Sequence, residues 1–188
     1  MRYSSHVRGG RRVVQSIKMA DEPVISFAIR SFRAPDLPAC RKLYLGGLIG
    51  GKISENDTAL DLDDIQTVYM ENPGNHFWVA TSVKEEAVIG MIGVQHHDEG
   101  VGEIRRLRVA DTHRRQGIGS ALVEQALKFC HERGYLKITL DTFLEREPAI
   151  KLFEKFRFRH YRTREVGGKN LMYFYLDLYM GEEQRKEQ

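Results

Sequence analysis

Several kinds of residue and segment are scarce in this chain of 188 residues, and each scarcity excludes a class of protein. Only Cys40 and Cys130 could form a disulfide or bind zinc through sulfur, and neither lies in a CxxC or zinc-type spacing, so we expect two reduced thiols. No apolar run approaches the roughly 20 residues that span a bilayer, and the first residues lack the apolar core of a secretory signal. We therefore expect a cytoplasmic protein with no membrane partner.

The chain also has little excess of positive over negative charge, since its formal net charge is only +3. Much of the excess comes from a basic N-terminal segment that carries no carboxylate before Asp21. Such a segment can act as an arm for nucleic acid, but no aromatic platform or helical stripe accompanies these charges. We therefore predict a disordered tail over residues 1–25 and no nucleic-acid partner.

The periodic segments predict one α/β domain over residues 26–180, followed by a charged tail over residues 181–188. The length and the composition, 41% hydrophobic and 29% charged, suit a single core. Apolar alternation or short apolar runs predict strands at 26–32, 76–83, 87–97, 102–109, 136–142, 158–166 and 171–180. Helical spacing predicts helices at 34–49, 60–72, 117–133 and 147–156.

Two details of these segments are specific enough to test. The strand at 102–109 breaks its alternation at Arg105 and Arg106, which is typical of a β-bulge. The strand at 136–142 alternates cleanly, so its apolar side chains are expected to point inward: Leu136, Ile138 and Leu140.

The stretch RRQGIGSAL, residues 114–122, follows a strand and opens a helix. That order places free backbone N–H groups at a helix N-terminus, where the partial positive charge attracts phosphate, and glycine lets the phosphate approach. A dinucleotide-binding GxGxxG pattern would need a third glycine at Leu122. A P-loop pattern at residues 46–52 fails as well, because Ile53 replaces the Ser or Thr that holds magnesium.

The remaining pattern, Arg114-x-x-Gly117-x-Gly119, resembles the (R/Q)xxGxG/A signature of the GNAT superfamily of N-acetyltransferases. The stretch LRVADTHRRQGIGSALVEQAL is similar to the central motif of that superfamily throughout, and LDTFLEREPAIKLFEKFRF resembles its following LxT…AxxLYEKxGF segment. The resemblance implies an α/β fold of GNAT type, with a central mixed, mostly antiparallel sheet of about six to seven strands flanked by about four helices.

The resemblance also implies an enzyme that moves the acetyl group of acetyl-CoA directly to a primary amine in a ternary complex. The backbone of Leu107 would lie toward the thioester oxygen, where it would stabilise the oxyanion, and the backbone of Val109 toward the pantetheine arm. The pyrophosphate would contact the residues of the glycine turn: Arg114, Arg115, Gln116, Gly117, Ile118, Gly119 and Ser120.

Glu103 is the candidate general base. A lysine-like amine has a pKa of about 10.4, so near neutral pH it arrives charged and must lose a proton. Glu103 begins the bulged strand, where many relatives carry a catalytic glutamate. No metal is expected, because His96 and His97 are adjacent in a strand and therefore point to opposite faces.

Three residues depart from the family pattern. Phe153 stands where many members have a tyrosine that protonates the departing sulfur, Arg157 replaces a glycine, and Arg146 stands where an asparagine often contacts the cofactor. Water, Tyr161 or Tyr173 are alternative acids, and a thiol of pKa about 8.5 can also leave unprotonated. The alternative function is an acyl-CoA-binding sensor or regulatory module without turnover.

The acceptor is expected between the loop at residues 46–58 and the turn at residues 164–170, by analogy with relatives. Small-molecule and peptide amines both stay open, and a homodimer is common among relatives. Acidic residues near the first loop could favour a cationic amine, although they also suit helix starts: Glu55, Asp57, Asp61, Asp63 and Asp64.

Overall fold

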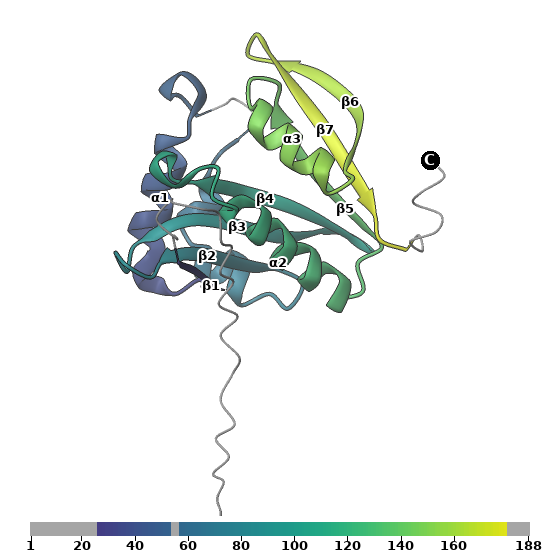
Figure 1. The fold of residues 1–188 in the computed structure, drawn as a ribbon. Coiled ribbons are helices and arrows are strands. Elements are labelled where there is room, and N and C mark those ends of the chain that lie inside the picture. Colours follow the sequence, from purple (N-terminus) through teal and green to yellow (C-terminus); the bar gives the residue numbers. More distant parts are fainter. Residues whose placement is uncertain (1–25, 54–56, 180–188) are drawn as a thin grey trace, which may run out of the picture.

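Seven strands form one sheet in the computed structural model, which describes residues 26–53 and 57–179. The strand order is β1-β2-β3-β4-β5-β7-β6 (Figure 1). Every neighbouring pair is antiparallel except β4 and β5, which are parallel. The mixed, mostly antiparallel sheet that the sequence predicts is confirmed. The two predicted tails, together with Glu55, lie outside the described residues.

The elements follow the predicted order closely. The strands are β1 Phe27–Ser31, β2 His76–Ser82, β3 Val88–Asp98, β4 Val101–Val109, β5 Lys137–Phe143, β6 Arg159–Val166 and β7 Lys169–Asp177. The α-helices of the described residues are α1 Leu37–Gly46, α2 Ile118–Glu132 and α3 Glu147–Lys155. Shorter helical turns are η1 Ala34–Asp36, η2 Ile49–Gly51, η3 Leu60–Leu62, η4 Gln66–Met70 and η5 Asp111–His113.

Helices cover both faces of the sheet. Side chains alternate along the central strands, so each face carries apolar side chains that a helix must bury. Trp78 and Ile92 belong to the core under α2 and α3, whereas Phe77 and Met91 belong to the core on the other face, under α1 and η4. Figure 1 shows α2 lying along the β1–β4 part of the sheet and α3 along the β5–β7 part. None of the helices in the described residues has the length and apolarity needed to cross a membrane.

The predicted bulge in β4 is confirmed. Gly93 pairs with Arg105 and Met91 with Arg108, so that Arg106 and Leu107 together lie opposite the single residue between them on β3. Arg106 takes up the irregularity with a φ of 59°, in the left-handed region that favours glycine. The bulge follows shortly after Glu103, the last residue of β4 that pairs with β5.

Two details of the sequence prediction are wrong. The helix expected at 60–72 is a 3-10 turn, η3, followed by one π-helical turn, η4; between them Asp64 Oδ1 accepts from the backbone N–H of Thr67, a local bond that starts a new helical segment. Leu136 does not point inward and is 56% exposed, because it precedes β5 and packs against Gly100 instead of joining the alternation of the strand.

Candidate active site

A cavity of about 360 Å³ opens where β4 and β5 part. The pairing of these two strands ends at Glu103 and Thr139, and beyond that point neither strand completes the ladder with the other. The walls come from β4, β5, α3, the loop after α1 and the turn between β6 and β7, so both loops at which the sequence places the acceptor contribute. Glu103 and Leu107 line this cavity, whereas the glycine turn lies outside it, at the far end of β4.

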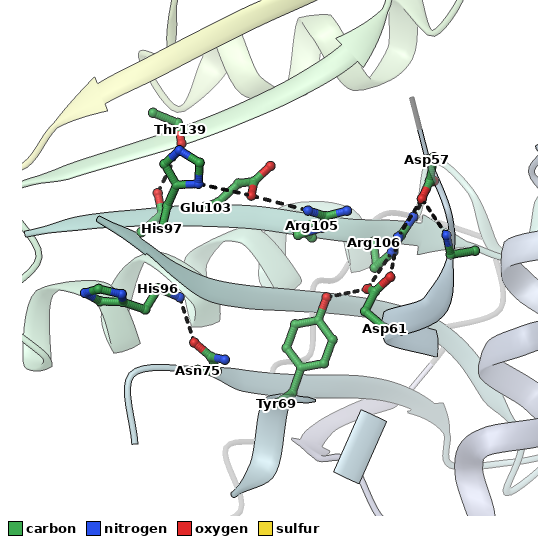
Figure 2. Close-up of polar contacts among 12 residues, drawn as sticks. Asp57, Asp61, Tyr69, Asn75, His96, His97, Glu103, Arg105, Arg106 and Thr139 are labelled. Carbon is green, nitrogen blue, oxygen red and sulfur yellow. Dashed lines mark hydrogen bonds and ion pairs between the residues drawn. The ribbon is translucent and has the colours of Figure 1, made fainter. Parts of the chain in front are cut away.

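Glu103 lies on the cavity wall with its side chain 20% exposed. Its Oε2 is 3.4 Å from Arg105 Nη1 and 3.9 Å from His97 Nδ1 (Figure 2). His96 points to the opposite side, where its backbone N–H donates to Asn75 Oδ1 at 2.7 Å. The carboxylate is therefore held between two nitrogen groups, and no cluster of three or more metal-ligating side chains occurs among the described residues.

The backbone of β4 presents polar groups to the gap. Ala110 N–H donates to Ile89 O of β3 at 2.8 Å, and the alternation of an antiparallel ladder then directs the N–H and C=O of Val109, and the C=O of Leu107, away from β3. The carbonyl of Leu107 accepts a bond from Arg108 Nη1 at 2.8 Å, and that of Val109 from Arg114 Nε at 3.4 Å.

The glycine turn has the form of an anion site. Gly117 caps α2 with a φ of 80°, and no side chain caps the helix. The first helical bond is Ala121 N–H to Gly117 O, so the preceding amides of the helix have no partner within it. A Cβ on Gly119 would lie 3.2 Å from Leu152 Cδ2, so this glycine also lets α2 approach α3.

Arg114 and Arg115 differ in their surroundings at this turn. Arg114 Nη2 is 2.6 Å from Asp111 Oδ1, so its charge is already partly neutralised. Arg115 is exposed and holds a left-handed φ of 63°. The turn thus gathers the residues that the sequence assigns to the pyrophosphate, and Arg115 is the more available of its two cations.

Sequence reasoning missed a buried ion cluster beside the cavity. Arg106, only 6% exposed, donates to Asp57 at 2.5 and 2.8 Å and to Asp61 at 2.8 Å (Figure 2). Tyr44 donates to Asp57 at 2.9 Å and Tyr69 to Asp61 at 2.7 Å. Burial alone would raise the pKa of both carboxyl groups, but the hydrogen bonds from Arg106 outweigh it and hold each pKa below its ordinary value.

The acidic residues that follow α1 have partners within the fold. Asp57 and Asp61 are committed to Arg106, Asp63 pairs with Arg41 at 2.7 Å, and Asp64 accepts from the backbone N–H of Thr67 at 3.0 Å. These internal contacts account for the four acidic residues. The other carboxylates on the cavity wall are on β4 and β5: Glu103, which lies beside Arg105, and Asp141.

A family model described as Acetyltransferase (GNAT) family matches residues 38–158, more than half of the chain. The protein belongs to the GNAT family of acetyltransferases. Its fold agrees with a solved member, a GNAT-family acetyltransferase from Staphylococcus aureus Mu50, with a TM-score of 0.71 at 20% identity over 81% of this chain and 99% of that chain.

Curated relatives match about half of this GNAT chain. Human N-acetyltransferase 8 is 38% identical over 104 residues, which are 53% of this chain and 45% of the relative. The N-acetylaspartate synthetase of Xenopus tropicalis is 38% identical over 101 residues, 53% of this chain and 36% of that protein. The chain therefore spans less than half the length of these two relatives.

The departures from the GNAT motif have clear positions in the structure. Phe153 is 3% exposed and lines the cavity, so no hydroxyl group stands there. Arg157 holds a φ of 64° just after α3, the left-handed position at which a glycine commonly ends a helix. Arg146 lines the cavity and donates to Gly47 O at 2.8 Å.

The tyrosines proposed as replacement acids lie elsewhere. Tyr161 is 54% exposed and packs with Tyr173 and Tyr175 on the β6–β7 hairpin, and neither Tyr161 nor Tyr173 is among the described residues that line the cavity. The tyrosine on the wall is Tyr44, which the sequence did not single out. Burial, aided by its bond to Asp57, raises the pKa of Tyr44 to about 12.

Proposed function

We propose that the protein transfers the acetyl group of acetyl-CoA directly to a primary amine. The observation that carries this proposal is the cavity between the parting strands, which has a carboxylate on its wall and backbone groups of the bulged strand facing the gap. The same strand leads into the glycine turn, where free helical amides suit a pyrophosphate. One strand thus connects a candidate anion site to a candidate reaction site.

Each residue of this arrangement has a distinct task. Glu103 accepts a proton from the ammonium group of the acceptor, because only the neutral amine attacks a thioester. The Leu107 N–H donates to the oxygen that becomes negative as the amine adds, a contribution that is usually the largest single one in acyl transfer. His97, 63% exposed beside Glu103, lies on the path by which that proton reaches solvent.

The thiolate can leave without a general acid at position 153, where this chain has phenylalanine instead of tyrosine. A thiol with a pKa of about 8.5 is a stable enough anion to depart near neutral pH, and water that enters the cavity can protonate it afterwards. The relatives support amine acetylation as the reaction class, since their names describe N-acetyltransferases and a synthetase of N-acetylaspartate. The acceptor of this chain is accordingly proposed to be a small-molecule amine, with a peptide amine as the second candidate.

The alternative is an acyl-CoA-binding module without turnover, which the phenylalanine at position 153 favours. Calorimetric titration with acetyl-CoA, with ATP as the control anion, tests the part that both functions share. Saturable binding of acetyl-CoA in the micromolar range with much weaker binding of ATP is expected. An absence of acetyl-CoA binding would reject both functions.

Release of free CoA in the presence of an amine panel separates the two functions. Glu103→Gln is expected to lower kcat by about 10²- to 10⁴-fold while acetyl-CoA binding stays unchanged, because a general base contributes about that much. Glu99→Gln, on the exposed turn between β3 and β4, is the matched control and should behave as the unmodified protein. Turnover that is insensitive to Glu103→Gln would remove Glu103 from the mechanism, and binding without turnover for any amine would favour the sensor.

A further inference from the structure

The cavity that contains Glu103 has an excess of cations. Six cationic side chains line it, against three carboxylates. Asp57 is taken by Arg106, and Glu103 lies beside Arg105. Among the described residues, no carboxylate forms an ion pair with the four remaining cations: Lys52, Arg108, Arg146 and Lys169.

Arg108 is the most deeply placed of these four. Its Nη1 donates to Leu107 O at 2.8 Å, while its Nε is buried without a hydrogen-bond partner. A guanidinium has five N–H donors, and a buried donor left unpaired is costly. Arg108 therefore keeps at least one donor without a partner, beside the backbone carbonyl of Leu107, and its side chain lines the wall where the proposed reaction takes place.

Gly47 brings a second guanidinium to the same place. A Cβ at position 47 would lie 2.9 Å from both Cδ and Nε of Arg108, so the glycine makes room for that side chain. Its carbonyl oxygen accepts a bond from Arg146 Nη2 at 2.8 Å. Burial, followed by the nearby charge of Arg146, lowers the pKa of Arg108 to about 10, which leaves both groups charged at neutral pH.

Arg108 and Arg146 are both half-buried, and two like charges so placed repel each other unless an anion lies near them. A second group of like charges lines the cavity from β4 and β5, where burial, followed by the nearby charge of Glu103, raises the pKa of Asp141. The loops add two further cations to the wall, Lys52 and Lys169. The cavity thus contains a pair of neighbouring carboxylates, suited to an ammonium group, and a pair of neighbouring guanidinium groups, suited to a carboxylate.

This inference rests on the proposed function and specifies its substrate class. We propose that the acceptor carries a carboxylate in addition to its amine, as a free amino acid does, and that Arg108 together with Arg146 binds the carboxylate. A guanidinium matches a carboxylate with two parallel hydrogen bonds, which gives geometric selectivity as well as affinity. Neutral amines and amidated amino acids lack that group and should be poor acceptors.

Matched acceptor pairs test the proposal. L-alanine, L-phenylalanine and L-aspartate are each compared with their own α-amide, at saturating acetyl-CoA, by the release of free CoA. For the best acceptor, kcat/KM should be at least tenfold higher for the acid, mainly through KM. Amidation lowers the pKa of the neighbouring amine and so supplies more of the reactive neutral form, which means that a preference for the acid cannot come from amine reactivity.

Single substitutions test which residues make the protein prefer the acid over its amide. Arg108→Gln should lower kcat/KM for the acid by on the order of 100-fold, since charge-assisted bonds to the carboxylate are lost, and should change the value for the amide by less than threefold. Arg146→Gln should act in the same direction with a smaller loss. Arg133→Gln, an exposed residue at the end of α2 that does not line the cavity, is the control and should leave both acceptors unchanged.

Two results would overturn the proposal. One is equal use of acid and amide by the unmodified protein. The other is an Arg108→Gln variant that raises the KM for acetyl-CoA and keeps its preference for the acid, because the guanidinium would then serve the phosphates of the cofactor.

A binding measurement separates this proposal from the proposed function. The complex of the protein with CoA is titrated calorimetrically with each acid and its amide, which requires no turnover. Binding that is selective for the acid and lost in Arg108→Gln, in a protein that acetylates neither, would keep the carboxylate site and reject the acetyl transfer. Equal binding of acid and amide, or none of either, would reject the carboxylate site.

Discussion

Arg106 and Arg108 are two residues apart on β4, line the same cavity and have opposite electrostatic surroundings. Arg106 is surrounded by acceptors, with two carboxylates on its guanidinium and a tyrosine hydroxyl donating to each carboxylate. Arg108 has a cation as its charged neighbour and a buried Nε without a partner. We therefore expect the neutralised guanidinium of Arg106 to stabilise the fold and that of Arg108 to bind a ligand.

The backbone reflects the same division. Arg106 holds a left-handed φ that is unfavourable for any residue with a Cβ, whereas Arg108 lies in the regular ladder opposite Met91. The unfavourable φ of Arg106 is offset because its side chain forms an ion pair with Asp61 and so connects β4 to η3. Removing each guanidinium should therefore have very different effects on stability.

The largest effect is expected from Arg106→Met. This change leaves Asp57 and Asp61 as uncompensated charges in a half-buried site, and breaking such a cluster typically costs about 3–5 kcal/mol. The free energy of unfolding from denaturant titration measures it. A triple variant that also carries Asp57→Asn and Asp61→Asn should recover part of the loss. A loss below about 1 kcal/mol for Arg106→Met alone would mean that the cluster contributes little.

The pH dependence of stability should change sign in the same variant. In the unmodified protein the folded pKa values of Asp57 and Asp61 are lowered, so their contribution is present above the unfolded value of about 3.9 and is lost as the pH falls through the folded values. Without Arg106, burial raises both pKa values, so the carboxyls favour the protonated form and the variant gains stability as the pH falls from 7 to 5.

Unfolding titrations at several pH values distinguish these cases. The difference in the free energy of unfolding between the unmodified protein and Arg106→Met should become smaller as the pH falls, by at most about 1.4 kcal/mol per pH unit for each carboxylate. Parallel curves for the unmodified protein and Arg106→Met from pH 7 to pH 5 would contradict the assignment of the cluster.

Local sequence patterns predicted the strands, the bulge and the glycine turn, because each of these leaves a signal within a few residues. The broken alternation at Arg105 and Arg106 located the bulge, and the residues after it located the capping Gly117. The partners of the two arginines left no such signal. Asp57 is 49 residues from Arg106 in the chain, so the pairing depends on how the segment that leads into η3 is placed against β4.

The candidate site was predictable only where its groups are local to β4. Glu103 and Leu107 do lie together on the cavity wall, but the roles of Tyr44 and Arg146 depend on where α1 ends and where α3 begins relative to the sheet. For the acidic residues after α1 the sequence left a cationic amine and a helix start as alternatives, because nothing in it indicated that a buried arginine would bind two of them. The unpaired Arg108 was missed for the same reason.

A smaller effect isolates the backbone strain at the bulge. Arg106→Gly and Arg106→Ala both lose the ion cluster, but glycine adopts the φ of 59° freely, so the glycine variant should be more stable by about 1 kcal/mol. Denaturant titration of the two variants gives the difference directly. The same pair at Arg105, whose φ is not left-handed, is the control, and there the alanine variant should be the more stable one. Equal stability of the two variants at position 106 would place the strain elsewhere.

The smallest effect is expected from Arg108→Met, and it would complete the contrast with Arg106→Met. The change removes a buried charge that has no carboxylate partner and relieves its repulsion with Arg146, while it sacrifices one hydrogen bond to the Leu107 carbonyl. These contributions oppose each other, so the free energy of unfolding should change by less than about 1 kcal/mol, in either direction. A loss comparable to that of Arg106→Met would show that Arg108 is also needed for the fold, and its unused donors would then be a consequence of packing and not a site kept free for a carboxylate.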